Sequence, residues 1–309
     1  MVRFFIMRNL VGILFIDKPI GITSSLVDKI CKRTFGLSKA GHVGTLDPFA
    51  SGLLPVAFNG ATKLIPYIKW TDTKTYVFEI EFGTQTDTGD VTGKVVATTG
   101  IIPTKQQTED ILSNFIGQIQ QKPHVYSAVK INGKKSYELA RRGIYAGIKT
   151  KPVKIYDLKL IKQINDKAYK LEATVSSGTY IRSLTEDIAL ALGSVGYTKT
   201  LRRTKIGCYG TSVTLDQIKN CRENINEVVE VINDNTSDKV WLSVDNILDD
   251  IPVVNVLDSE ATDLRLGRTI RWNGTNGVYL VKSLNGFVNL SECENGYLQP
   301  KRLIRNIGV

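Results

Sequence analysis

Segments in which apolar and polar residues alternate, separated by short turns, constrain the fold of this chain more than any other feature. Over residues 75–82, aromatic and β-branched residues alternate with Glu79 and Glu81, which predicts a strand with one buried face. We expect further strands at 13–16, 153–164, 169–176 and 195–205. Because helical segments interrupt these strands without an internal repeat, we predict a mixed α+β fold. Its sheet is expected to be mainly antiparallel with flanking helices, rather than doubly wound and parallel.

The helical segments begin at residues that typically cap helices. Thr23, Ser24 and Ser25 precede a helix whose apolar positions share one face. Those positions are Leu26, Val27, Ile30 and Cys31. Other helices are predicted at 61–68, 104–115, 134–142 and 179–192, the last capped by Ser177-Gly178-Thr179.

The C-terminal part of the chain differs in its turn residues. Four Asn-Gly pairs, a hairpin signature, separate short apolar runs at 273–274, 276–277, 285–286 and 295–296. With 309 residues the chain is long enough for one large core or two smaller ones. We therefore predict a main domain over residues 1–244 and a small β-rich domain over residues 245–309.

The charge of the chain is strongly basic and unevenly distributed. The formal net charge is +10, which favours a polyanionic partner. Ten cations face two acids over residues 122–159, whereas eight acids face two cations over residues 222–250. This segregation favours one basic working face and an acidic back over an evenly mixed surface. The alternative is a solvated lysine-rich surface without a specific partner.

Cysteine usage and hydropathy bear on the compartment. The four cysteines are scattered without a Cys-x-x-Cys pair, which is typical of reduced thiols in a cytosol. The apolar run 10–16 imitates a secretory signal, but Asp17-Lys18-Pro19 follows it without a cleavage site, so we expect a buried strand and a turn. No other run approaches the roughly 20 apolar residues of a membrane span. We predict a cytoplasmic protein that has no membrane segment.

Several common catalytic constellations do not match this sequence. Its two histidines, His42 and His124, lie in no zinc-binding motif, and neither a phosphate-binding loop nor a dinucleotide fingerprint occurs. The run 176–178 is not a nucleophile elbow. Asp87 and Asp90 lack the spacing of a calcium loop, so the segment around them is expected to be a turn between strands. A catalytic metal centre is therefore not expected.

Asp47 remains as a reactive group, within the glycine-rich stretch 40–52. Pro48 restricts Asp47 to extended geometry, and an ionised aspartate can act as a nucleophile or stabilise charge without a dedicated base. In an apolar setting it would need a positive partner, and Arg182 could pair with it. Tyr76 is either a core residue or a platform for a base. The alternative for Asp47 is a turn or cap residue before proline.

Long, ordered motifs from residue 17 to residue 204 resemble one family, the bacterial tRNA pseudouridine synthases of the TruB type, which isomerise the uridine at position 55 of the TΨC loop. The motifs are Asp17-Lys18-Pro19-Ile20-Gly21-Ile22-Thr23-Ser24, Gly41 to Pro48 with Gly52-Leu53-Leu54-Pro55, Ala61-Thr62-Lys63, Tyr126-Ser127-Ala128-Val129-Lys130, Ser177 to Leu184, and Leu201-Arg202-Arg203-Thr204. One position departs from the family, which usually has Pro-Pro before the Tyr-Ser-Ala stretch. Here His124 follows Pro123.

The resemblance implies a function and a set of site residues. It implies the pseudouridine synthase fold over residues 1–244, a PUA-like RNA-binding domain over residues 245–309, and the tRNA T stem-loop as the partner, with no obligate protein partner. The reaction would need neither metal nor cofactor. The implied roles are Asp47 as the catalytic aspartate, Arg182 as its partner, Tyr76 against the uracil and in proton transfer, His42 stacked into the RNA loop, and Tyr180 and Leu201 lining the uridine pocket.

Two other functions remain open at this point. A noncatalytic RNA-binding or tRNA-folding protein would use the same basic face, with Asp47 as a turn residue. An aspartate-nucleophile hydrolase would release its product instead of isomerising the substrate. In the resembling family, the target uridine is flipped out of its stack, which costs a few kcal/mol that aromatic contacts offset.

Overall fold

The computed structural model describes residues 10–124, 126, 130–131, 134–136, 149–220, 240–248 and 250–305. Within these residues a ten-stranded sheet has the order β13-β1-β3-β12-β4-β11-β10-β7, with β14 paired to β1 and β2 to β3. The strands are β1 Gly12–Lys18, β2 Ala40–His42, β3 Ser51–Phe58, β4 Thr73–Phe82, β7 Gly117–Gln121, β10 Lys151–Asn165, β11 Ala168–Ser176, β12 Gly196–Ile206, β13 Val213–Thr214 and β14 Trp241–Ser243. The long alternating strands predicted from the sequence are confirmed.

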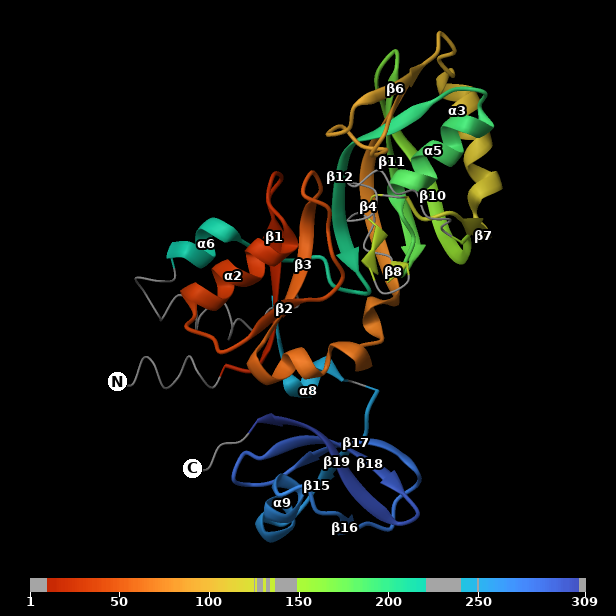
Figure 1. Ribbon diagram of the computed structural model, residues 1–309. Helices are drawn as coiled ribbons and strands as arrows, with labels where there is room; N and C mark the ends of the chain where they lie inside the picture. The colour runs from red at the N-terminus through yellow and green to blue at the C-terminus, as the bar shows by residue number, and fades with distance from the viewer. Residues whose placement is uncertain are drawn as a thin grey trace.

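The large sheet consists of two halves that meet at one short junction (Figure 1). β3 and β12 pair in parallel through two positions only, Arg202 with Ser51 and Arg203 with Gly52. Gly52 has φ +103°, and a Cβ there would collide with the Arg203 carbonyl oxygen. A glycine is therefore required where the two halves join. Most other pairings are antiparallel, so the predicted mixed, mainly antiparallel sheet is confirmed.

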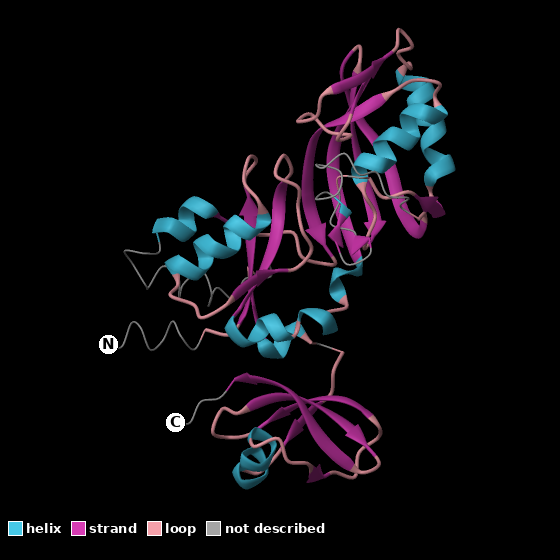
Figure 2. Ribbon diagram, in the orientation of Figure 1, coloured by secondary structure: helices cyan, strands magenta, loops and turns pink. Residues whose placement is uncertain are grey.

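Helices flank the sheet (Figure 2). They are α2 Ser24–Thr34, α3 Lys105–Leu112, α5 Ile181–Ala191, α6 Leu215–Asn220 and α8 Val244–Ile247, whereas α9 Asp258–Arg265 packs in the core of the C-terminal part. Thr23 caps α2 by accepting from the Leu26 backbone N–H, as predicted. Leu184 and Ile188 of α5 are fully buried in the core shared with β4 and β11. Within the described residues no helix has the length and apolar character needed to cross a membrane.

A second sheet forms the C-terminal part, which confirms the predicted β-rich character of that region. Its order is β15-β17-β18-β19-β16, and its strands are β15 Val253–Asn255, β16 Ile270–Arg271, β17 Gly277–Lys282, β18 Val288–Glu294 and β19 Tyr297–Arg305. Asn295 and Gly296 have φ values of 52° and 82°, as the tight hairpin between β18 and β19 requires. Leu280, Leu290 and Ile304 pack with Ile13 and Phe15 of the first part.

Several local predictions are wrong. The predicted helix over 61–68 is a pair of 3₁₀ turns, Asn59–Lys63 and Ile65–Tyr67, because Pro66 has no N–H to donate to an α-helix. The Asn-Gly pairs at 273–274 and 276–277 form no hairpin, since β16 pairs with β19 and not with β17. Leu26 is 41% exposed, so the buried face of α2 is narrower than predicted.

Two more differences concern helix starts. Tyr180, not the run 177–179, is the N-cap of α5, and Thr179 instead donates to the Ser176 carbonyl in a turn. The helix predicted from residue 134 is contradicted at its start, where β9 Lys134–Lys135 pairs with β8 Lys130–Ile131. Much of the predicted basic segment, and most of the acidic stretch over 222–250, lie outside the described residues.

Candidate active site

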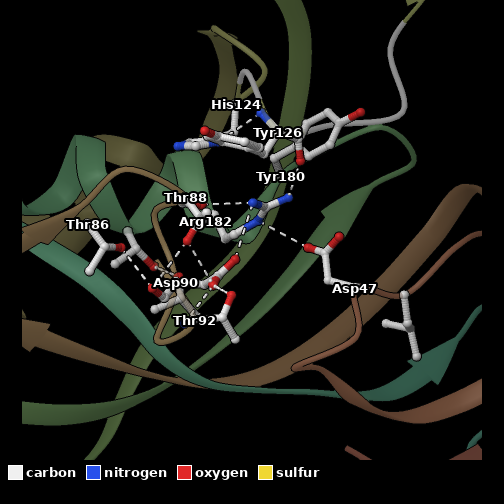
Figure 3. Close-up of polar contacts among 12 residues, drawn as sticks. Asp47, Thr86, Thr88, Asp90, Thr92, His124, Tyr126, Tyr180 and Arg182 are labelled. Atoms are coloured by element: carbon white, nitrogen blue, oxygen red, sulfur yellow. Dashed lines mark hydrogen bonds and ion pairs between the residues drawn. The ribbon is translucent and has the colours of Figure 1, made fainter. Parts of the chain in front are cut away.

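The site is organised around the guanidinium of Arg182, in the first turn of α5. Its side chain is 4% exposed and contacts segments that are distant in sequence (Figure 3). Nε lies 3.0 Å from Oδ2 of Asp47, and Nη1 lies 3.3 Å from Oδ2 of Asp90. Nη1 also donates to the Thr88 carbonyl at 2.8 Å, and Nη2 to the Tyr126 carbonyl at 2.9 Å. The cation is held in one orientation between two carboxylates.

The loop that carries Asp47 is anchored on both sides by the segment after β1. The Ser24 hydroxyl donates to the Leu46 carbonyl at 3.0 Å. The same hydroxyl accepts from the Leu46 backbone N–H, also at 3.0 Å. The Pro48 carbonyl accepts from the Gly21 N–H at 2.8 Å. These bonds explain why the 17–24 and 41–48 motifs occur together, because the first supplies the contacts that hold the second.

The Asp47 carboxylate itself is accessible, with a side chain that is 37% exposed. Partial burial raises its pKa above the usual range for aspartate, and the Asp90 carboxylate acts in the same direction. Arg182, His124 and Lys18 lower the pKa in opposition. The arrangement gives one reachable carboxylate whose ionised form is stabilised mainly by a guanidinium. Such a group can serve as a nucleophile or can stabilise positive charge developing on a sugar.

Asp90 is a site residue that the sequence reasoning missed, since the segment around it was expected to be only a turn. It is 4% exposed and lies just after the short strand β5 Thr84–Thr86, which pairs with β6 Val95–Thr98. Its Oδ1 accepts from the hydroxyls of Thr88 at 3.0 Å and Thr92 at 2.6 Å, and from the Thr92 N–H at 2.9 Å. The flanking threonines are a signal in the sequence, because their donors can satisfy a buried carboxylate.

Tyr76 and Leu201 lie on neighbouring strands of the large sheet, β4 and β12. Each is 7% exposed. Tyr76 of β4 pairs with Arg203 of β12, and Leu201 pairs with Phe78, so the two candidate side chains share one face of the sheet. The Tyr180 main chain is fixed by the Gln121 side chain, which accepts from its N–H at 2.8 Å and donates to its carbonyl at 3.1 Å.

His42 is placed apart from the Arg182 centre, on β2. Its Nδ1 lies 2.7 Å from Oδ2 of Asp28, and its Nε2 lies 3.0 Å from the Thr45 hydroxyl. The ring is 18% exposed and is held in place on both edges. The structure therefore brings Asp47 and Arg182 into contact. His42 lies five residues before Asp47 and contacts Asp28 and Thr45 instead.

His124 touches the site through Tyr126. Its Nδ1 accepts from the Tyr126 N–H at 3.3 Å, and the two rings stack with centroids 6.0 Å apart. The Nε2 atom faces Oε1 of Glu186 on α5 at 3.6 Å. Because the Tyr126 carbonyl holds Arg182, His124 contributes to the placement of the guanidinium. Within the described residues, no three His, Cys, Asp or Glu side chains are grouped as metal ligands would be.

Family models match most of the chain. The model of the TruB family pseudouridylate synthase N-terminal domain matches residues 32–181, and that of the tRNA pseudouridylate synthase B C-terminal domain matches residues 182–248. The tRNA pseudouridine synthase B of Bradyrhizobium diazoefficiens is 35% identical in an alignment of 309 positions that covers 98% of this chain and 88% of that protein. The protein of the same name from Azoarcus is 39% identical, covering 95% of this chain and 94% of the relative.

Solved structures share the fold. A chain in a structure of an H/ACA RNP bound to a substrate RNA containing 2′-deoxyuridine has a TM-score of 0.62 at 22% identity, covering 96% of this chain and 85% of that one. A chain in a Cbf5-Nop10-Gar1 complex has the same TM-score at 23% identity, with coverages of 96% and 84%. At these identities the likeness establishes the architecture alone.

Proposed function

Because the chain belongs to the TruB family of pseudouridylate synthases and is a tRNA pseudouridine synthase, an isomerase, we propose that it converts uridine 55 in the T loop of tRNA to pseudouridine. The pairing of Asp47 with Arg182 is the observation that supports this assignment most directly. It supplies an accessible carboxylate next to a buried, fixed cation. The bases of an RNA duplex or stacked loop are out of reach of such a carboxylate until the target nucleotide is flipped out.

The proposed reaction rearranges one nucleotide and needs no second substrate. Asp47 attacks the ribose, or otherwise drives cleavage of the bond between C1′ and N1 of the uracil. The freed uracil rotates and its C5 forms a bond to C1′, and any bond that Asp47 has made to the sugar breaks in this step and returns the free carboxylate. The proton on C5 leaves and N1 gains one, so the product is an isomer of the substrate. We assign the stabilisation of the ionised Asp47 to Arg182, which also orients the carboxylate.

The remaining site residues are proposed to bind and position the flipped nucleotide. Tyr76 lies against the uracil and assists the proton transfer, while Tyr180 and Leu201 line the uridine position. His42 stacks into the RNA loop and holds it open once the target has left. Aromatic contacts of this kind contribute about 1 to 3 kcal/mol per base, enough to offset flipping. Tyr76 and Leu201 are almost completely buried in the sheet, which supports their proposed role as a rigid wall of the uridine pocket.

The basic charge of the chain supports binding of the folded RNA through phosphates, which makes the affinity decrease with salt. We propose that residues 1–244 form the catalytic domain and that residues 245–309 form a PUA-like domain that adds RNA contacts. We propose that this chain binds the T stem-loop without a protein partner. A cytoplasmic location remains a prediction from the scattered cysteines.

The test uses a T-arm RNA hairpin and the Asp47→Asn variant. We expect loss of pseudouridine, detected by mass spectrometry of the digested RNA, with hairpin affinity retained within about threefold, since this carboxylate contributes little to phosphate binding. Asp157→Asn, on the exposed side of β10, is the matched control and keeps full activity. Normal conversion by Asp47→Asn would overturn the catalytic assignment. Free uracil with an abasic sugar would instead support a hydrolase.

A further inference from the structure

Arg203 on β12 is a buried cation for which the described residues supply no counter-ion. It is 1% exposed, as deeply buried as Arg182, which pairs with two carboxylates. Its Nε donates to the Leu53 carbonyl at 2.7 Å and its Nη2 to the Gly44 carbonyl at 3.0 Å. Among the described residues, no aspartate or glutamate forms an ion pair with Arg203. A buried charge without a partner of opposite sign is costly, so its presence calls for an anion.

Two lysines add to the same positive region. Lys74 of β4 donates to the Ser177 hydroxyl at 3.0 Å, and the Lys151 Nζ lies 4.7 Å from the centre of the Tyr180 ring. Both are half-buried, and neither has an ion pair among the described residues. Burial, Arg203 and Lys151 lower the pKa of Lys74 to about 8, while Asp72 opposes them. Burial also lowers the pKa of Lys151. The protein alone thus disfavours the charged forms of these lysines.

The three cations converge on the backbone of the loops that carry the site residues. A Cβ built on Gly44, three residues before Asp47, would lie 3.5 Å from Nη1 of Arg203 and 3.6 Å from Nζ of Lys74. A Cβ built on Gly178, two residues before Tyr180, would lie 3.1 Å from Nζ of Lys151. Because both positions lack a Cβ, the amines can lie this close to the loop backbone.

We propose that Lys74, Lys151 and Arg203 form a subsite for a backbone phosphate of the RNA that flanks the flipped uridine. This subsite rests on the proposed function for the identity of its ligand. A phosphodiester carries the missing negative charge and accepts several hydrogen bonds at once, and Nη1 of Arg203 has no acceptor among the described residues. Holding the phosphate beside the target also fixes the sugar in front of Asp47.

The test is a coupling experiment between protein and RNA. T-arm hairpins with one neutral methylphosphonate linkage, either 5′ or 3′ of the target uridine, are compared with the unmodified hairpin by fluorescence anisotropy. We expect Lys74→Gln to lower the affinity for the unmodified hairpin about tenfold. We expect the neutral linkage at one of the two positions to lower the affinity of the wild-type protein by a similar factor. Lys74→Gln then causes less than about a twofold further loss with that hairpin, because the contact is already gone. Lys151→Gln is expected to show the same coupling.

Lys105→Gln is the matched control, since Lys105 is an exposed lysine on α3 that pairs with Glu109. Its effect is expected to be small and the same for every hairpin. Arg203 is left intact, because its bonds to Leu53 and Gly44 hold the junction of the sheet. The subsite is overturned if the losses from Lys74→Gln and from each neutral linkage simply multiply.

The two proposals fail in different ways. Coupling without pseudouridine in the same hairpins leaves the subsite standing and contradicts the proposed reaction. Pseudouridine without coupling contradicts the subsite alone. If the wild-type protein binds no hairpin, inorganic phosphate serves as the probe, and acetylation of Lys74 is followed by mass spectrometry. Phosphate is then expected to slow acetylation of Lys74 but not of Lys105, and equal rates with and without phosphate would overturn the subsite.

Discussion

The Asp90 carboxylate lies 3.3 Å from Nη1 of Arg182, the same guanidinium whose Nε contacts Asp47. Arg182 is thus shared between an accessible carboxylate and a buried one. Burial raises the pKa of Asp47, Arg182 lowers it, and Asp90 raises it further, so Arg182 and Asp90 both contribute to the pH range in which Asp47 is ionised.

Asp90→Asn is expected to lower the pKa of Asp47, because a like charge is removed. The acid limb of the pH profile of kcat/KM then moves to lower pH. The plateau falls by about tenfold, since Arg182 loses one of its orienting partners. Initial rates of pseudouridine formation across pH provide the measurement. Asp87→Asn, in the same hairpin, is the control, and an acid limb that stays unchanged in Asp90→Asn contradicts the expectation.

Replacing Arg182 by Met is expected to cost about 3 to 5 kcal/mol of unfolding free energy, because buried Asp90 loses its counter-ion. Combining this change with Asp90→Asn restores part of the loss. Urea unfolding of both single variants and of the double variant measures the coupling. Arg202→Met removes an exposed bidentate pair with Asp17 and is expected to cost no more than about 1 kcal/mol. Equal losses in Arg182→Met and Arg202→Met would refute the burial argument.

Asp47→Asn is expected to leave the folded protein as stable as the wild type at neutral pH, or more stable. Burial raises the pKa of Asp47 in the folded state, so that state binds the proton more tightly than the unfolded chain. Ionisation of Asp47 therefore costs folding free energy above its raised pKa. Below the unfolded value of about 3.9 the carboxyl is protonated in both states, and the difference between the proteins disappears. Urea unfolding at several pH values would disprove this if the variant is less stable at neutral pH.

Changes at His124 separate positioning from binding. His124→Phe keeps a ring next to Tyr126 but removes the nitrogen that accepts from the Tyr126 backbone N–H. The Tyr126 carbonyl, which accepts from Arg182, is then held less firmly. We expect kcat to fall about fivefold with KM nearly unchanged. His124→Asn supplies an oxygen in the place of Nδ1 and is expected to recover most of that loss. Steady-state kinetics distinguish a positioning role from a binding role. A change confined to KM would show that His124 contacts the RNA instead of positioning Arg182.

Gly52→Ala tests the junction between the two halves of the sheet. A Cβ at this position collides with the Arg203 carbonyl, and the φ of +103° is unfavourable for alanine. We expect a loss of more than about 2 kcal/mol in unfolding free energy. Gly100→Ala is the control, because nothing lies within 4 Å of a Cβ there. If Gly52→Ala and Gly100→Ala had similar unfolding free energies, the strands β3 and β12 could move apart at the junction without loss of stability.

Much of the architecture is encoded locally. The alternation over 75–82, 153–164, 169–176 and 195–205 specifies which side of each strand is apolar, and β4, β10, β11 and β12 form there. The Asn-Gly turns at 285–286 and 295–296 likewise determine their own backbone conformation. Predictions based on pattern alone were wrong where one residue overrode it, as Pro66 does in the 61–68 segment.

For the site, the sequence determined that Asp47 is the candidate reactive group, by eliminating other chemistries and by resemblance to a family. Only the tertiary structure decided that Asp90, 92 residues from Arg182, completes the centre, and that Arg203 is buried with no counter-ion in the part of the chain that the structure describes. A polar turn and a buried carboxylate have the same local sequence, as do an exposed and a buried arginine on a strand. Burial and charge pairing depend on which distant segments meet, and that is set by the packing of the whole chain.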